Sequence, residues 1–277
     1  MPLADAHVHL FSNGYAGTWG PLLQNEVEVY EQLRALFAID RALVVGYEGE
    51  GRYNGNNDYI LSLARTRPWL VPLAYLEEEQ PTLERLRQLR EAGAAGYSIY
   101  VRDESSARAV SAWSKEVLDA LDRQQAIISL NATPAAAAAL GPFVDSLDGC
   151  ALLFSHLGLP GRFARMPSPA EARARLQALL AFADRPHVHV KFSGLYAVSD
   201  PAHDFPHPVV QPILEALIEA FGVARLCWGS DFAPALEFVS FGQIADDRLL
   251  ARLDERDVAA VMGANLQRVL QSRPETE

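Results

Sequence analysis

The alternation of short apolar runs with longer amphipathic segments restricts the fold of this chain more than any other feature. Eight mostly apolar runs recur, each short enough to form one buried strand. Between them lie segments with apolar residues three and four positions apart, the spacing of a helix that packs one face against a core. Strands that alternate with helices in this way are typical of parallel α/β folds. The expected strands are 3–8, 42–45, 71–74, 95–99, 126–130, 151–154, 188–191 and 226–228.

The number of strands favours a closed barrel over an open sheet. An open doubly wound sheet usually has fewer strands and a glycine-rich phosphate turn, and no Gly-x-Gly-x-x-Gly follows any expected strand. The chain has 277 residues, close to the roughly 250 of one α/β barrel, and 49% of them are hydrophobic. We therefore predict a single (β/α)8 TIM barrel, regular or distorted, that occupies residues 1–277 as one domain.

Charge and composition exclude several classes of partner. A net charge of −11 with interspersed Lys and Arg lacks the concentrated basic face that nucleic acid requires. No apolar run approaches the roughly 18 residues of a membrane span, and the N-terminus lacks the basic region of a signal peptide. Cys150 and Cys227 lie in separate apolar runs, as core residues do. We expect a cytoplasmic protein that acts on a small molecule, with a homo-oligomer compatible with the sequence.

Polar residues interrupt the ends of the apolar strands. Burial without partners would cost about 1–3 kcal/mol for each such group, so a functional reason is expected. Because parallel strands of a barrel end at one face, where active sites are built, these side chains should form a ring. Residues two apart on a strand point the same way, so both histidines of the first strand should face the barrel mouth. The ring comprises His7, His9, Asn131, His156, Lys191 with Ser193, and Asp231.

Each member of the ring has an ordinary structural explanation when it is taken alone. His7-x-His9 is a common chance pattern, Asp231 and Asn131 can cap helices, and Lys191 can pair with Asp231. Three histidines and a carboxylate at one face of one barrel, however, favour hydrolytic chemistry. Neutral imidazoles and a carboxylate can bind Zn²⁺ and leave a position for water. Without a metal, Asp231 can itself take a proton from water while the histidines polarise a carbonyl.

The ordered motifs resemble those of the amidohydrolase-2 family of the amidohydrolase superfamily, and especially its lactonase branch. They are Asp5-Ala-His7-Val-His9-Leu, Ser155-His156-Leu-Gly-Leu-Pro160, Val190-Lys191-Phe-Ser193-Gly-Leu, Trp228-Gly-Ser-Asp231 and, near the end, Asn265. The resemblance covers essentially the whole chain. It implies that His7 and His9 are a first-strand ligand pair. It further implies that His156 is the sixth-strand catalytic histidine and that Asp231 activates water.

Two positions depart from the pattern of metal-dependent members. Asn131 stands where they place a fifth-strand histidine, and Tyr97-Ser-Ile-Tyr100 stands where binuclear members carry a bridging lysine. A binuclear centre is therefore not expected. The resemblance leaves two alternatives, of which one divalent ion held by His7, His9 and Asp231, with zinc preferred, is slightly favoured. The other is a metal-free site like the one ascribed to 2-pyrone-4,6-dicarboxylate lactonase.

We expect the substrate to be a lactone or a similar cyclic ester. The residues expected to bind it are Asn131, Lys191, Tyr47, Tyr100 and Arg102, and Lys191 with His156 is expected to stabilise the developing oxyanion. The long segments 12–25 and 46–59 follow strands and can wall or cover the pocket, although solvated loops without function remain the alternative. Two other functions stay open. One is non-oxidative decarboxylation of an aromatic or muconate-type acid, and the other is ligand binding by a barrel that has lost catalysis.

Overall fold

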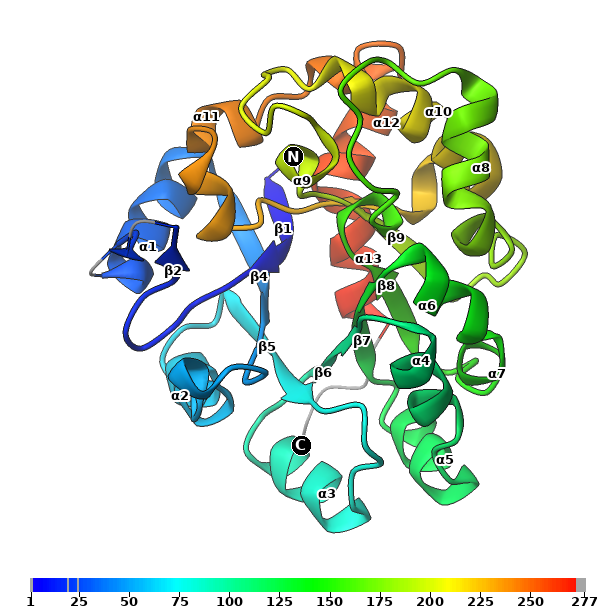
Figure 1. Ribbon diagram of the computed structural model, residues 1–277. Coiled ribbons are helices and arrows are strands. Elements are labelled where there is room, and N and C mark those ends of the chain that lie inside the picture. The colour runs from blue at the N-terminus through cyan, green and yellow to red at the C-terminus, as the bar shows by residue number, and fades with distance from the viewer. Residues whose placement is uncertain (1, 19, 24, 273–277) are drawn as a thin grey trace.

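The computed structural model describes residues 2–18, 20–23 and 25–272 and confirms the barrel. The eight strands hydrogen-bond in the order β1-β4-β5-β6-β7-β8-β9-β10, and every ladder is parallel. Helices ring the strands on the outside (Figure 1). The strands are Leu3–Val8 (β1), Ile39–Val45 (β4), Leu70–Leu76 (β5), Gly96–Val101 (β6), Ile127–Ala132 (β7), Ala151–Phe154 (β8), Val188–Phe192 (β9) and Leu226–Trp228 (β10).

Every expected strand is present, and several are longer than expected. β4 begins at Ile39 because Ile39 and Arg41 both pair with β1. The exposed Asp40 and Arg41 interrupt the apolar pattern, so a search for apolar runs misses this part of the strand. The helices are Glu26–Leu36 (α1), Asn56–Ala64 (α2), Leu83–Glu91 (α3), Glu104–Ser111 (α4), Lys115–Arg123 (α5), Pro134–Ala139 (α6), Gly141–Val144 (α7), Pro169–Leu180 (α8), Leu195–Val198 (α9), Gln211–Phe221 (α10), Phe241–Ile244 (α11), Glu255–Ala259 (α12) and Asn265–Gln271 (α13).

The last helical region of the chain, residues 255–271, is not one continuous α-helix. A π-helical stretch, Ala260–Ala264, separates α12 from α13. Gly263 in this stretch lies against the start of β1, where a Cβ atom would come within 2.5 Å of the Pro2 carbonyl oxygen. The wider turn and the glycine thus let the helix approach the barrel closely. Periodicity along the sequence carries no signal for such a local change.

The two long segments after strands also contain regular structure. Segment 12–25 includes a two-stranded antiparallel hairpin, Ala16–Gly17 (β2) with Gly20–Pro21 (β3). In segment 46–59, residues 56–59 form the start of α2. The buried Glu26 carboxylate holds the first segment, because it accepts the backbone N–H groups of Phe11 (2.7 Å) and Tyr15 (2.5 Å). In the second segment the Asn56 amide donates to the Leu10 carbonyl (2.8 Å) and the Asn57 amide to the Tyr75 carbonyl (3.0 Å), so both segments are attached to the barrel rim.

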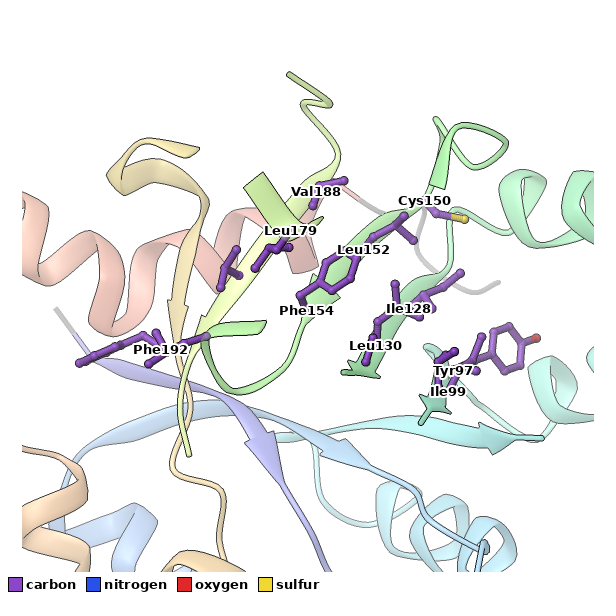
Figure 2. Close-up of a cluster of buried hydrophobic side chains, with 14 of the residues drawn as sticks. Tyr97, Ile99, Ile128, Leu130, Cys150, Leu152, Phe154, Leu179, Val188 and Phe192 are labelled. Atoms are coloured by element: carbon purple, nitrogen blue, oxygen red, sulfur yellow. The ribbon is translucent and has the colours of Figure 1, made fainter. Parts of the chain in front are cut away.

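The core has two layers, as the alternation of side chains on each strand requires. One apolar cluster lies between the strands and the helices, and Figure 2 shows its part at β6 to β9, with Leu179 of α8 among the side chains. A smaller cluster, including Ala4, Leu43, Leu73 and Cys227, fills the barrel interior. Both cysteines are buried, as expected. No helix in the described part of the chain is long and apolar enough to cross a membrane.

The barrel closes between β10 and β1 through a short and irregular seam. A single bridge joins Val8 to Phe232, beyond the end of β10, and the His9 N–H donates to the Phe232 carbonyl (2.5 Å). The Asp231 N–H donates to the His7 carbonyl (2.8 Å). Register shifts in β1 between Asp5 and Val8 accompany this seam. The irregular closure is functionally relevant, because it places Asp231 beside the histidine pair.

Candidate active site

His7 and His9 lie at the end of β1 and meet Asp231 at the barrel mouth. Their Nε2 atoms are 3.0 Å apart, and they lie 3.7 and 3.8 Å from Oδ1 of Asp231. All three residues are buried. Among the described residues this is the one group of three or more His, Cys, Asp or Glu side chains whose ligand atoms converge closely enough for a metal ion. The expected convergence of the first and last strands is therefore present.

The spacing of these donor atoms fits a single divalent ion. Bonds of about 2.0–2.2 Å to zinc place tetrahedral donors about 3.3–3.6 Å apart, within the range of the three separations found here. Burial lowers the pKa of His9 to about 4 and that of His7 well below its usual value, so both imidazoles are neutral at pH 7. Nδ1 of His9 lies 2.8 Å from the Val45 carbonyl, which fixes its hydrogen there and leaves the Nε2 lone pair available.

Asp231 has two differently placed carboxylate oxygens. Tyr196 of α9 donates its hydroxyl to Oδ2 at 2.8 Å, while Oδ1 faces the histidine pair. Burial, and next the charge of Asp231, raise the pKa of Tyr196 well above its usual value, so the phenol keeps its hydrogen. Asp231 adopts a left-handed backbone conformation, with φ of 55°. The carboxylate is thus held in one orientation by the seam and by Tyr196.

His156 follows β8 and lies near the other oxygen of the same carboxylate. Its Nδ1 is 3.1 Å from Oγ of Ser193 and 3.8 Å from Oδ2 of Asp231, and its ring centroid is 4.6 Å from that of His7. Burial lowers its pKa, which favours the neutral ring. Gly194 packs against this imidazole so closely that a Cβ atom would lie 2.3 Å from Nδ1. The expected sixth-strand histidine therefore belongs to the same cluster.

Lys191 of β9 is fully buried beneath His7. Its Nζ lies 3.0 Å from Nδ1 of His7 and 2.6 Å from Oγ of Ser129 on β7. Burial lowers the pKa of Lys191 to about 7. The Lys191 amine therefore contacts Nδ1 of His7, whereas Nε2 of the same ring faces Asp231. From this position Lys191 can influence a bound substrate only by orienting His7.

The other expected substrate-binding residues lie toward the rim. Asn131, near the end of β7, is half-buried and on the same strand face as Ser129, with Tyr100 as its register partner on β6. Tyr47 and Tyr100 have ring centroids 4.7 Å apart. The exposed Arg102 donates to the Tyr47 hydroxyl at 2.7 Å. The sequence-predicted residues thus fall into a buried centre and an outer wall.

Several residues of the centre escaped the sequence reasoning. Tyr196 lies two residues after Gly194 of the strand-seven motif, but nothing in that motif shows that its hydroxyl turns back to Asp231. Ser129 lies two residues before Asn131 on the same strand, so its side chain points to the same side of the sheet. This spacing could have identified Ser129 from the sequence. Asp5 resembles an interior residue by alternation, yet its carboxylate accepts the Tyr30 hydroxyl of α1 at 3.0 Å and the Ser230 N–H at 2.8 Å. The register shift in β1 accounts for that difference.

The fold and the cluster define a (β/α)8-barrel enzyme with a metal-capable site at the carboxyl ends of its strands. The sequence profile of the amidohydrolase family (Amidohydro_2) matches residues 4–271. The chain belongs to this family and is an enzyme of the amidohydrolase superfamily, as the motifs predicted. A search of functionally curated proteins finds no significant match.

Solved structures share the fold at low sequence identity. An amidohydrolase from Burkholderia multivorans with bound zinc has a TM-score of 0.80 at 20% identity, over 99% of this chain and 100% of that chain. A probable 2-pyrone-4,6-dicarboxylic acid hydrolase from Acinetobacter baumannii with citric acid bound has a TM-score of 0.74 at 15% identity, over 98% and 100%. The 2,6-dihydroxybenzoate decarboxylase from Rhizobium has a TM-score of 0.64 at 12% identity, over 98% and 99%.

Proposed function

We propose that the protein hydrolyses a lactone or a similar cyclic ester, with Asp231 as the base that takes the proton from the attacking water. The position of Asp231 carries this proposal: Oδ2 is held by Tyr196 at 2.8 Å, and Oδ1 is directed at the two histidines. A water molecule beside Oδ1 would be within reach of this base. The proton can then pass from Asp231 to the leaving alkoxide oxygen, so the base is regenerated and the product is a hydroxy acid.

His7, His9 and Asp231 would hold one divalent ion, with zinc as our preferred candidate. When bound, such an ion lowers the pKa of water and polarises an ester carbonyl. The neighbour from Burkholderia multivorans with bound zinc supports this choice. Lys191 and Ser129 keep the His7 ring in place from below. A single ion agrees with the three converging donor atoms and with Asn131 at the expected position of a further histidine.

His156 is the proposed donor to the developing oxyanion. Ser193 accepts the His156 backbone N–H at 3.3 Å and can turn its hydroxyl hydrogen toward Nδ1, 3.1 Å away. The ring hydrogen then resides on Nε2 and is available to a substrate oxygen. Because burial lowers the pKa of His156, the ring donates this hydrogen bond as a neutral imidazole. Asp231 therefore serves as the base and His156 as the electrophilic partner.

The test is hydrolysis of a panel of sugar-acid lactones by wild-type protein and by Asp231→Asn, followed through acid release with a pH indicator. Asparagine tolerates the left-handed backbone at this position, so the variant should fold and keep its unfolding midpoint. We expect a rate loss of about 10²- to 10⁴-fold. The Tyr196→Phe variant is a matched control, which retains the base and should lose much less. Undiminished turnover by Asp231→Asn would rule out this role.

A second assay separates hydrolysis from decarboxylation. The fold is also shared by the Rhizobium decarboxylase, so release of carbon dioxide from aromatic and muconate acids should be measured in parallel. We expect no release above that of a blank. Carbon dioxide release without lactone hydrolysis would replace the proposal by the decarboxylase alternative. If metal-loaded protein catalyses neither reaction, the results would favour the alternative that the barrel binds a ligand without catalysis.

A further inference from the structure

A series of packed aromatic rings, called the aromatic wall below, leads from the candidate metal centre to the ends of β4 and β6, and its inner members Phe11 and Tyr53 are buried. His9 is stacked on Phe11, with ring centroids 5.8 Å apart and planes inclined by 7°. The ring centroids of Phe11 and Tyr53 are 4.1 Å apart, and those of Tyr53 and Tyr47 are 5.7 Å apart. Tyr47 in turn packs against Tyr100, with ring centroids 4.7 Å apart. The wall therefore connects the histidine pair with the ends of β4 and β6.

A cavity of about 310 Å³ lies at the outer end of this wall. Tyr75 and Tyr100 form its aromatic side, and their ring centroids are 6.1 Å apart. Burial raises the pKa of Tyr75 to about 12, so its hydroxyl is uncharged at neutral pH. Arg102 lines the cavity as well and is tied to the Tyr47 hydroxyl. The volume suits a substituent or a small ring attached to the reacting group.

The remaining lining gives the cavity a strongly negative field. Its carboxylates are Glu48, Glu77, Glu78, Glu79 and Asp103. Set against the single guanidinium of Arg102, five acidic groups leave four negative charges in excess. Two of the five already accept hydrogen bonds from the protein, since Glu48 binds Asn57 and Asp103 caps α4 through Ser106. The consecutive glutamates 77–79 add further acceptors at the rim.

We propose that this cavity is the subsite for the distal end of the substrate, and that it accepts a hydrogen-bond-donating group without negative charge and rejects carboxylates. Hydroxyl or ammonium groups can donate to the acidic rim while the apolar face of the same group packs on Tyr75 and Tyr100. A second carboxylate would meet like charges on most sides. The substrate class thus differs from the dicarboxylate named for the Acinetobacter neighbour.

This inference rests on the proposed lactone hydrolysis and is tested with matched six-membered lactones. They carry a carboxylate, a hydroxymethyl or an aminomethyl group on the carbon next to the ring oxygen. At low ionic strength we expect kcat/KM for the carboxylate to be lower than for the other two by about tenfold or more, with the difference shrinking in salt. The hydroxymethyl and aminomethyl compounds separate a neutral from a cationic preference. A carboxylate lactone that is the best substrate would overturn the proposal.

The double variant Glu77→Gln with Glu79→Gln tests the cavity itself. Both side chains are exposed, so the variant should fold. Because Gln keeps an oxygen acceptor but removes the negative charge, the variant should raise the ratio of kcat/KM for the carboxylate lactone to kcat/KM for the hydroxymethyl lactone. Glu84→Gln with Glu91→Gln on α3 makes the same change of net charge away from the cavity lining and should leave both values as they are. Equal effects of the two double variants would contradict a local subsite.

Binding of the corresponding lactams, measured by titration calorimetry, separates failure of this inference from failure of the proposed function. If no lactone is hydrolysed but the hydroxymethyl or aminomethyl lactam binds more tightly than the carboxylate, the subsite survives and the lactonase reaction does not. If the lactones are hydrolysed without the expected preference, the subsite assignment is wrong and the reaction stands. Absence of both hydrolysis and binding would refute both.

Discussion

The seam that closes the barrel depends on one buried carboxylate, and its removal should destabilise the protein strongly. Oδ1 of Asp5 accepts the backbone N–H groups of His7 (3.1 Å) and Ser230 (2.8 Å), and Oδ2 accepts the Tyr30 hydroxyl (3.0 Å). Asp5→Ala would leave three buried donors without this acceptor. At about 1–3 kcal/mol for each unsatisfied donor, the free energy of unfolding should fall by at least about 3 kcal/mol.

Asp5→Asn is the matched control, because the geometry lets an amide replace the carboxylate. Its oxygen can accept both N–H groups in place of Oδ1, and its NH₂ group can donate to the Tyr30 oxygen, whose hydroxyl hydrogen rotates away. We expect this variant to be no more than about 1 kcal/mol less stable than wild type. The two variants therefore differ in hydrogen bonding while both remove the charge.

The assay is equilibrium unfolding in urea at pH 7, with kcat/KM on the best lactone as a second measurement. Because Ser230 precedes Asp231, the alanine variant should also lose activity in its folded fraction. If Asp5→Ala does not fold, Tyr30→Phe removes one of the three donors and should cost about 1 kcal/mol. Equal stability of the alanine and asparagine variants, or an alanine variant within about 1 kcal/mol of wild type, would refute the role of these hydrogen bonds.

Two further outcomes follow from the electrostatics. Burial raises the pKa of Glu26 from 4.5 to about 7, so the folded protein binds the proton more tightly than the unfolded chain. Relative to Glu26→Gln, the free energy of unfolding of the wild type should therefore be highest below pH 4.5 and should fall by up to about 3 kcal/mol as the pH rises through 7. Urea titrations at several pH values measure this difference, and a difference that does not vary with pH would contradict the prediction. In titration calorimetry, metal-stripped protein should bind about one zinc ion per chain. The His9→Asn variant should weaken the zinc affinity at least about tenfold, whereas His203→Asn, at an exposed position, should leave it unchanged. Binding of two ions per chain would argue against the mononuclear site.

The sequence alone determined the architecture and the inner members of the site. Apolar runs that alternate with amphipathic segments reflect burial on both faces of parallel strands, and this property is local enough to be seen without a structure. The same logic located His7, His9, His156 and Asp231, because strand ends of a parallel barrel must share one face. Ordered motifs then indicated the amidohydrolase family, which the profile match over residues 4–271 confirms.

The tertiary structure decided what depends on contacts between segments distant in the chain. The hydroxyl of Tyr196 reaches Asp231 across 35 positions, and Nζ of Lys191 reaches His7 across 184. Neither hydrogen bond leaves a periodic trace in the sequence, since each depends on the curvature and closure of the whole barrel. The orientation of Asp5 likewise follows from a register shift that alternation does not predict. Sequence pattern fixes which residues arrive at the barrel mouth, whereas packing across the closed sheet fixes how their donor atoms face one another.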